Sequence, residues 1–320
     1  LSADDTAIYA AYNSGALDFI ENVPNDEITA VIETEDFHIV DSLGTYYIGF
    51  NVNDKIFEGK TVEEANKMRQ AISLMIDRSY IAEKIGQTGQ VPADSFVPAG
   101  MQDGNGGIFH TVGDAYSYYD AESTGAGQAK EAMKLLEECG YTFKDNEDGT
   151  YACSPAISMT YLTNEGTNHE AIAQTIQMDL ATIGIEMKIA VEEWNVFLES
   201  RKNGRFTIAR EGWVADYNDP VNMLEVFTSY SGNNDMQLGK EEKSYAPEWK
   251  AYDELIQKIH TTTDFENRVE LMHQAEDMLM ETYAVVPLYY YNDIYMQKSD
   301  VEGVYATIYG LKYFMYATRS

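Results

Sequence analysis

Arg210-Glu-Gly-Trp-Val-Ala-Asp-Tyr-Asn-Asp-Pro220 joins a predicted strand, 206–210, to a predicted helix. The pair Asp219-Pro220 is typical of a helix start, because an aspartate side chain accepts hydrogen bonds from the first helical N–H groups and proline suits the first helical position. The residues in between follow no regular pattern and are predicted to form a loop at the strand end. A strand, a loop and a helix in succession form the unit from which α/β sheets are built.

Three side chains of this loop could bind a ligand: Trp213, Asp216 and Tyr217. In open α/β sheets, ligands bind at the ends of strands. The two aromatic rings offer flat apolar walls, and the carboxylate offers a charged contact for a cation. The alternative is that Asp216 only accepts hydrogen bonds from the N–H groups of its own turn. Asp219 is interpreted as structural, since it is the predicted helix cap.

The rest of the chain alternates between strand-like and helix-like segments. Expected strands lie at 17–23, 45–52, 157–162, 185–191, 206–210 and 285–291, and expected helices at 61–80, 128–139, 170–183, 194–198, 249–260 and 265–281. Thr61 and Glu64 have the spacing of a capping box. The glycine-containing stretch 86–125 is predicted to be a long surface loop. The alternation favours an α/β sheet that helices cover on both faces.

The charge and composition exclude several classes of protein. The 320 residues include 22 Lys+Arg and 53 Asp+Glu, which gives a formal charge of −31, so the chain repels nucleic acid and anionic membranes. A hydrophobic content of 44% is typical of a folded protein. No stretch approaches the ~18 consecutive apolar residues of a membrane-spanning helix. The length favours about two domains.

Common motifs of catalysis and cofactor binding are missing from the sequence. It contains no GxGxxG, GxxxxGKS/T, GxSxG, HExxH or CxxC pattern, and its five histidines are not spaced as zinc ligands. We therefore expect neither a metal nor a cofactor. Cys139 and Cys153 could form a disulfide or remain free thiols. Because acidic residues are abundant, a pair of carboxylates acting as in a glycoside hydrolase stays possible.

Several segments, in the right order, resemble the oligopeptide-binding proteins, the extracytoplasmic receptors of bacterial ABC importers of the peptide/nickel class. Arg210–Pro220 is similar to the GWxADYxxP segment of that family. The other similar segments are 47–53 with 68–78, 128–141, 174–184 with 185–194, and 285–291. The match covers essentially the whole chain.

The resemblance implies a fold and a division of the chain. We expect an α/β lobe of the periplasmic-binding-protein type II kind, with a mixed β-sheet flanked by helices, plus partial elements of the other lobe. Residues 1–45 are expected to be a partial first-lobe segment, 46–298 the second ligand-binding lobe, and 299–320 a C-terminal return to the first lobe. Since family chains carry a signal peptide and a lobe-forming N-terminal region, we expect this chain to be a C-terminal fragment that holds half of a binding site.

The resemblance also implies a function. The chain would belong to the substrate-binding component of an ABC transporter, which captures extracellular oligopeptides in a two-lobe cleft and performs no bond chemistry. Its partners would be the oligopeptide and the membrane permease and ATPase subunits, with no nucleic acid. The protein would be an extracytoplasmic monomer, attached to the membrane only through a lipid anchor outside these residues. Alternative ligands are a nickel complex or an oligosaccharide, and a less favoured alternative is an acidic extracellular glycoside hydrolase.

The family pattern assigns Asp216 to the free α-ammonium group of the peptide. A charge-assisted hydrogen bond gains strength as the closing cleft excludes water. Trp213 and Tyr217 are expected to line the cleft, with core packing as the alternative.

Two arginines and one histidine are further candidates implied by the resemblance. Arg210 and Arg201 match family arginines near the carboxylate end of the ligand, although Arg210 could instead pair with Glu211 or another acid. His169 lies about one residue away from a position at which some relatives have a histidine.

Overall fold

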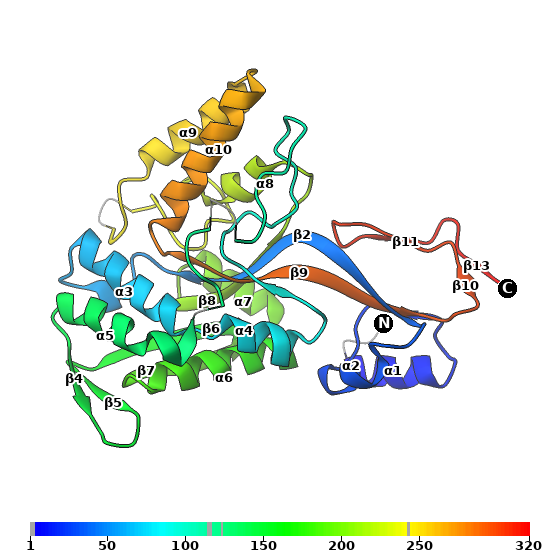
Figure 1. The fold of residues 1–320 in the computed structure, drawn as a ribbon, viewed down its shortest axis with the longest axis horizontal. Helices are drawn as coiled ribbons and strands as arrows, with labels where there is room; N and C mark the ends of the chain where they lie inside the picture. The colour runs from blue at the N-terminus through cyan, green and yellow to red at the C-terminus, as the bar shows by residue number, and fades with distance from the viewer. Residues whose placement is uncertain (1–3, 114–116, 123, 242–243) are drawn as a thin grey trace.

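The computed structural model describes residues 4–113, 117–122, 124–241 and 244–320 (Figure 1). Its main sheet has the strand order β1-β9-β2-β8-β6-β7, and β3 pairs with β9. The strands of this sheet are β1 Phe19–Ile20, β2 Phe37–Phe50, β3 Val91–Pro92, β6 Ile157–Asn164, β7 Ile185–Glu192, β8 Ile208–Val214 and β9 Val285–Gln297. Three small two-stranded sheets pair β4 Thr142–Asp145 with β5 Tyr151–Ser154, β10 Val301–Glu302 with β13 Thr318–Arg319, and β11 Tyr305–Ala306 with β12 Lys312–Tyr313.

The sheet is mixed, as the family resemblance predicted. β6 runs parallel to β7 and to β8, whereas β2 runs antiparallel to both β8 and β9. The α-helices are α1 Asp5–Asn13, α2 Asn25–Val31, α3 Val62–Met75, α4 Arg78–Tyr80, α5 Ala129–Glu138, α6 Thr167–Ala181, α7 Trp194–Lys202, α8 Pro220–Leu224, α9 Lys250–Thr261 and α10 Phe265–Met280. The expected α/β class is confirmed.

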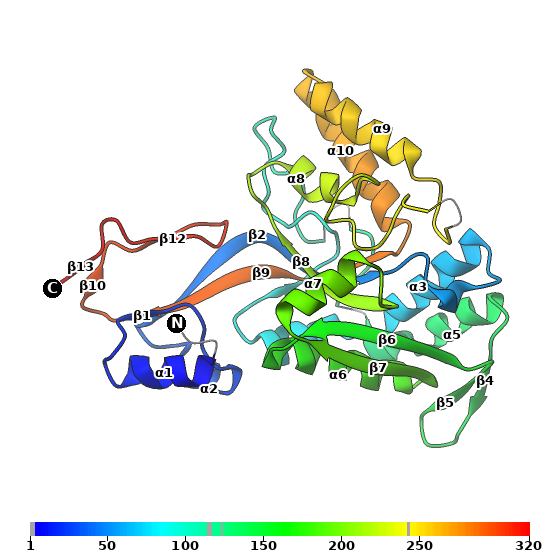
Figure 2. The same cartoon turned by 180° about the vertical axis from the view of Figure 1, so that it is seen from behind.

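Two large hydrophobic cores lie on opposite sides of the central strands (Figures 1 and 2). One core joins α3, α5 and α6 to the sheet through side chains such as Tyr46 and Ile48. The other joins α8, α9 and α10 through side chains such as Tyr47. Because successive side chains of a strand point to opposite faces, β2 contributes to both cores.

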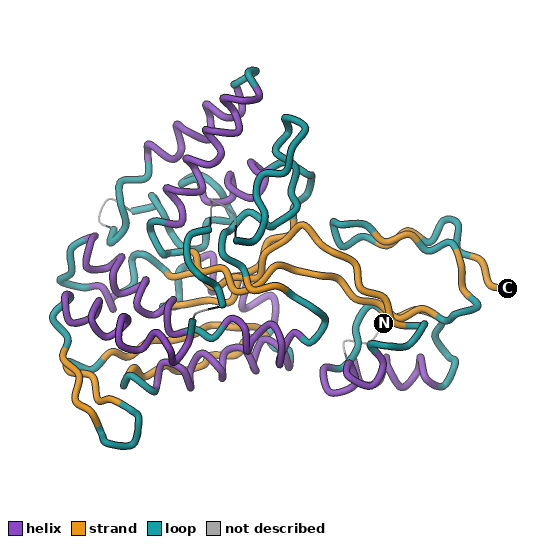
Figure 3. Tube along the Cα trace, viewed as in Figure 1, coloured by secondary structure: helices purple, strands orange, loops and turns teal. Residues whose placement is uncertain are grey.

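The long strands β2 and β9 leave the main body together and reach α1, α2 and the C-terminal hairpins (Figure 3). A third, smaller core forms at their far end from residues that include Tyr12, Ile28, Phe37 and Met296. The register of β2 against β9 shifts between Asp41 and Thr45. Residue 45, the expected end of the first-lobe segment, lies inside β2.

Local signals predicted helix starts well and helix ends less well. The capping box is confirmed: Thr61 Oγ1 accepts from the Glu64 N–H at 3.1 Å, and Glu64 accepts from the Thr61 N–H at 2.7 Å. The single helix expected at 61–80 is wrong in its last part, because α3 ends at Met75 and Asp77 caps the separate helix α4. The strand expected at 17–23 is only two residues long.

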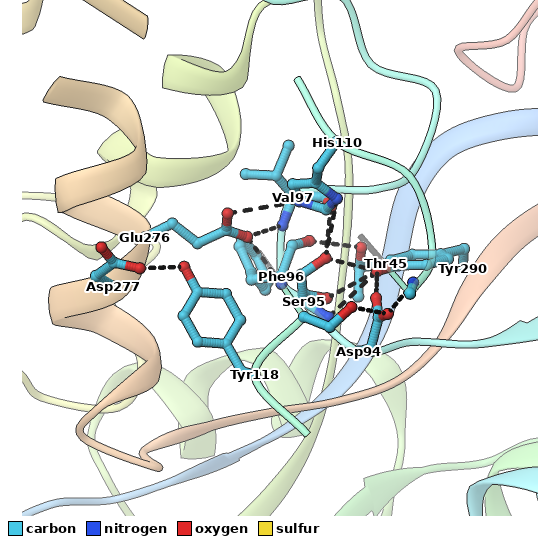
Figure 4. Close-up of polar contacts among 12 residues, drawn as sticks. Thr45, Asp94, Ser95, Phe96, Val97, His110, Tyr118, Glu276, Asp277 and Tyr290 are labelled. Atoms are coloured by element: carbon cyan, nitrogen blue, oxygen red, sulfur yellow. Dashed lines mark hydrogen bonds and ion pairs between the residues drawn. The ribbon is translucent and has the colours of Figure 1, made fainter. Parts of the chain in front are cut away.

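The segment 86–125 is not the surface loop that its composition predicted. Its described residues are largely irregular, but Ser95, Phe96 and Val97 are fully buried. Figure 4 shows how the buried backbone is satisfied: one oxygen of Glu276 in α10 accepts from the N–H groups of Phe96 and Val97 at 3.0 and 2.7 Å. On the other side, the Tyr290 hydroxyl of β9 donates to the loop's Asp94 at 2.9 Å. These contacts place the loop in the core.

Both cysteines are free thiols. Cys139 is buried, and its Sγ lies 3.2 Å from the carbonyl oxygen of Leu135 in the preceding helical turn. Among the described residues, no cluster of three or more His, Cys, Asp or Glu side chains is arranged to hold a metal ion. In the same residues, no helix combines the length and the apolar character that crossing a bilayer requires.

Candidate functional site

Asp216 lies on the loop between β8 and α8, where the sequence placed it. Its side chain is exposed and lines an open cavity of about 360 Å³ together with Trp213 and Asn222. Glu225 and His260 line the same cavity. A solute can therefore reach this carboxylate.

The buried side-chain amide of Asn222 contacts both Asp216 and Trp213 at the cavity. Asn222 Oδ1 accepts from the backbone N–H of Asp216 at 2.9 Å and from the indole N–H of Trp213 at 3.3 Å. Asn222 Nδ2 lies 3.5 Å from the carboxylate oxygen Asp216 Oδ2. Trp213 is half-buried and packs against the core on the α8 side, so it both lines the cavity and contributes to packing.

The helix that carries Asn222 is fixed at its N-terminus. Asp219 caps α8 by accepting from the Val221 N–H at 3.0 Å, and Pro220 occupies the first helical position, as predicted. Arg268 of α10 binds the two oxygens of Asp219 at 2.8 and 3.1 Å. Such bidentate pairs restrict geometry, so α8 is held firmly against α10.

A second acidic side chain, Glu225, lines the cavity, and both of its oxygens contact other side chains. Glu225 accepts from the Tyr217 hydroxyl at 3.1 Å and lies 3.1 Å from His260 Nε2. Burial and the nearby Glu225 raise the pKa of Tyr217 to about 12. Tyr217 is 43% exposed and contacts Glu225, but it is not one of the residues that line this cavity.

Arg210 and His169 meet around a single tyrosine ring. The Arg210 guanidinium lies 5.4 Å from the centre of the Tyr46 ring, and His169 Nδ1 lies 3.1 Å from the Tyr46 hydroxyl. Burial, and secondly the charge of Arg210, lower the pKa of His169 to about 3, so this histidine is neutral near pH 7. No carboxylate forms an ion pair with Arg210 among the described residues.

Arg201 is placed differently from Arg210. It contacts Glu211 at 2.5 Å and Asp235 at 3.1 Å, and all three side chains are largely buried. Burial raises the pKa of Glu211 to about 8, against the opposing effect of Arg201. Glu211 and Arg210 are neighbours in β8, so their side chains point to opposite faces. The structure therefore pairs Glu211 with Arg201 and leaves Arg210 without that partner.

One edge of β8 is open next to Asp216. β6 pairs with β8 only at Ile208 and Ala209. On the other edge, the Ala215 N–H donates to β2 at 2.8 Å, and antiparallel pairs alternate. The N–H and C=O groups of Gly212 and Val214 consequently point away from β2, toward the edge that no strand of the described chain covers.

The sequence reasoning missed three residues of this region. Asn222 lies in the short helix α8, and Glu225 follows it directly. Asparagine and glutamate are common at such positions, so the sequence did not mark them as site residues. Trp194 is the first residue of α7, two positions after β7 ends at Glu192, and it is 47% exposed. A tryptophan just after a predicted strand lies near the carboxyl ends of the parallel strands, where ligands bind in α/β sheets. Its position in the sequence could therefore have marked it as a candidate.

Residues 1–235 match the model of the bacterial extracellular solute-binding proteins, family 5. The chain is 31% identical over 305 residues to the dipeptide-binding protein DppE of Bacillus subtilis, covering 94% of this chain and 50% of that protein. It is 30% identical over 299 residues to the periplasmic oligopeptide-binding protein OppA of Haemophilus influenzae, covering 92% and 49%.

Solved structures show the same fold. The crystal structure of Haemophilus influenzae OppA in complex with the peptide RPPGFSPFR superposes with a TM-score of 0.73 at 27% identity, over 93% of this chain and 53% of that chain. The Escherichia coli murein tripeptide-binding protein MppA superposes with a TM-score of 0.74 at 25% identity, over the same shares. The chain spans about half the length of the relatives that it matches. It belongs to the bacterial extracellular solute-binding proteins of family 5.

Proposed function

We propose that this chain supplies one wall of a peptide-binding cleft in the substrate-binding component of an ABC importer. The observation that carries the proposal is the exposed carboxylate of Asp216 beside an uncovered strand edge. Names of relatives that bind dipeptides, oligopeptides and a murein tripeptide support it. The protein works outside the cytoplasm and binds its ligand without bond chemistry.

Asp216 binds the α-ammonium group of the peptide. Every peptide with a free N-terminus has this group, so the contact requires no particular sequence. A carboxylate–ammonium pair is stronger than a neutral hydrogen bond, and it strengthens further when a closing cleft lowers the local dielectric constant. The indole of Trp213 lines the same cavity and shields the pair.

The open edge of β8 binds the peptide backbone. An extended peptide can add a strand along Gly212 and Val214, whose N–H and C=O groups face this edge. Strand addition gives affinity through main-chain hydrogen bonds and leaves the side chains free to vary. The edge ends at the loop that carries Asp216, which sets the position of the ligand's first residue.

Arg210 binds a carboxylate of the ligand, with neutral His169 and Tyr46 beside it. An arginine without an acidic partner in the described chain is a ready site for an anion. Because Arg210 and Asp216 lie at opposite ends of this stretch of β8, the two charges match the two ends of a zwitterionic peptide. Arg201, with its two carboxylates, supports β8 from the other face.

The full protein would place a second lobe over this wall. We propose that residues 46–298 form the ligand-binding lobe, and that 1–45 and 299–320 belong to the first lobe, joined through the long strands β2 and β9. The complete receptor would close around the peptide, as a monomer, and deliver it to a membrane permease driven by an ATPase. A lipid anchor would lie outside these residues.

The test compares ligands on the full-length protein by calorimetry. We define the ammonium selectivity as the Kd for N-acetyl-trialanine divided by the Kd for trialanine. The proposal expects a selectivity on the order of tenfold to a hundredfold, because acetylation removes a charged hydrogen bond. A nickel–histidine complex and maltotriose serve as the other ligand classes. Binding of either one with no binding of trialanine would contradict the proposal.

A further inference from the structure

We infer that Asn222 is a positioning residue for ligand binding, because its one buried amide holds both the Asp216 carboxylate and the Trp213 ring at the cavity. This inference rests on the proposed role of Asp216. Neither the sequence pattern nor the comparisons single out this position.

The orientation of the Asn222 amide follows from chemistry. The backbone N–H of Asp216 and the indole N–H of Trp213 can only donate, and both lie within 3.3 Å of Asn222 Oδ1. A flipped amide would bring its NH₂ group against these two donors. The oxygen must therefore face them, which leaves the NH₂ group beside Asp216 Oδ2 at 3.5 Å.

This arrangement restricts a carboxylate that would otherwise be free to turn. Asp216 is exposed, and an exposed aspartate on a loop loses rotamer freedom when it binds a cation. Asn222 is only 3% exposed, and the capped and Arg268-bound helix α8 holds it in place. Through its hydrogen bonds, the Asn222 amide holds the loop that carries Asp216. The Asp216 side chain therefore loses less conformational entropy when the ligand binds.

The same amide sets the Trp213 ring. The indole N–H has Asn222 Oδ1 as its acceptor, so the ring plane and the Asp216 backbone share one anchor. Removal of the anchor would leave two donors without their acceptor and would release both groups together. The ligand-binding carboxylate and its aromatic neighbour are consequently coupled through one side chain.

The experiment measures ammonium selectivity in full-length Asn222→Leu, which has similar volume but no polar group. The expected result is that trialanine binds on the order of tenfold more weakly while N-acetyl-trialanine changes less than twofold. Intrinsic tryptophan fluorescence, compared between Asn222→Leu and the wild type without ligand, reports on the freed Trp213 ring. Asn51→Leu is the matched control, because Asn51 is also a buried amide that binds backbone groups but does not line this cavity, so the selectivity should stay unchanged.

A purely structural role predicts a different pattern, in which both ligands weaken equally or neither does; either pattern would overturn the inference. If Asn222→Leu does not fold, Asn222→Ser replaces it with the same expected change in selectivity. In an Asp216→Asn background, Asn222→Leu should reduce trialanine affinity less than twofold, since the pair acts as one unit. Unchanged selectivity in Asp216→Asn would refute the proposed function itself. If selectivity falls in Asp216→Asn but stays unchanged in Asn222→Leu, only the positioning role of Asn222 is refuted.

Discussion

Arg201 contacts Glu211 at 2.5 Å inside the protein, and the same guanidinium binds Asp235 at 3.1 Å. The arginine that resembled a ligand-binding residue is therefore the shared partner of two buried acidic side chains. Its neighbour in space, Arg210, has no such acid among the described residues. The two arginines therefore differ in their ion pairs, which is the basis for the different roles proposed for them.

Arg201→Met should lower the free energy of unfolding by about 3–5 kcal/mol, because it leaves the buried side chains of Asp235 and Glu211 without their shared partner. Urea unfolding measures the loss. The control is Arg205→Met, which removes an exposed pair with Glu199 at 3.6 Å and should change stability by less than about 0.5 kcal/mol. A stable Arg201→Met protein with a selective loss of peptide affinity would contradict the structural role.

The raised pKa of Glu211, about 8, has a consequence for pH dependence. The folded state keeps the proton on Glu211 at pH values at which the unfolded state, with a usual pKa near 4.5, has lost it. The proton therefore stabilises the folded state at low pH, and this stabilisation declines as the pH rises from about 4.5 to about 8, with a slope of at most about 1.4 kcal/mol per pH unit.

The test is the pH dependence of urea unfolding for the wild type and for Glu211→Gln. The glutamine cannot ionise, so the decline between pH 5 and 8 should be smaller in this variant than in the wild type. Identical pH profiles for the two proteins would show that Glu211 ionises in the folded state as it does in the unfolded one.

Glu276 should stabilise the folded protein by accepting hydrogen bonds from the buried loop that follows β3. Glu276→Ala removes the acceptor of the Phe96 and Val97 N–H groups and should destabilise the protein by about 2–4 kcal/mol. Glu276→Gln keeps a carbonyl oxygen and should lose less. Glu270→Ala, on the exposed face of α10, is the control and should stay within about 0.5 kcal/mol. Equal stability of the two Glu276 variants would argue against the backbone contacts.

Arg210→Gln should weaken binding at the carboxylate end of the ligand. In the full-length protein, trialanine should bind on the order of tenfold more weakly, whereas trialanine amide should change little, because the amide has no charge for the guanidinium to bind. Arg205→Gln serves as the surface control. A similar loss for both peptides would assign Arg210 to packing against Tyr46.

Local sequence signals predicted the parts of the fold that depend on neighbours along the chain. The Asp219-Pro220 cap, the Thr61–Glu64 capping box and the strand–loop–helix unit around Asp216 all follow from short-range hydrogen bonding and backbone preference. The same rules located an exposed carboxylate at a strand end, which is the central feature of the site.

The remaining features depend on contacts between distant segments. The glycines of the 86–125 stretch resemble a surface loop, but Glu276, 180 residues beyond Phe96, supplies the acceptor that allows burial. Asn222 lies six residues after Asp216, a spacing that does not by itself predict a contact. The contact forms because α8 turns back onto the loop. The different surroundings of Arg201 and Arg210 likewise appear only when the fold brings Glu211 of β8 and the distant Asp235 to Arg201.

The most direct test of the central claim is the ammonium selectivity of full-length Asp216→Asn, measured by calorimetry beside the wild type. The amide keeps the shape of the side chain and removes its charge. If Asp216 binds the α-ammonium group, trialanine should lose roughly tenfold or more in affinity, N-acetyl-trialanine should be nearly unaffected, and the selectivity should fall toward one. An undiminished selectivity in Asp216→Asn would contradict the claim that this carboxylate binds the peptide's α-ammonium group.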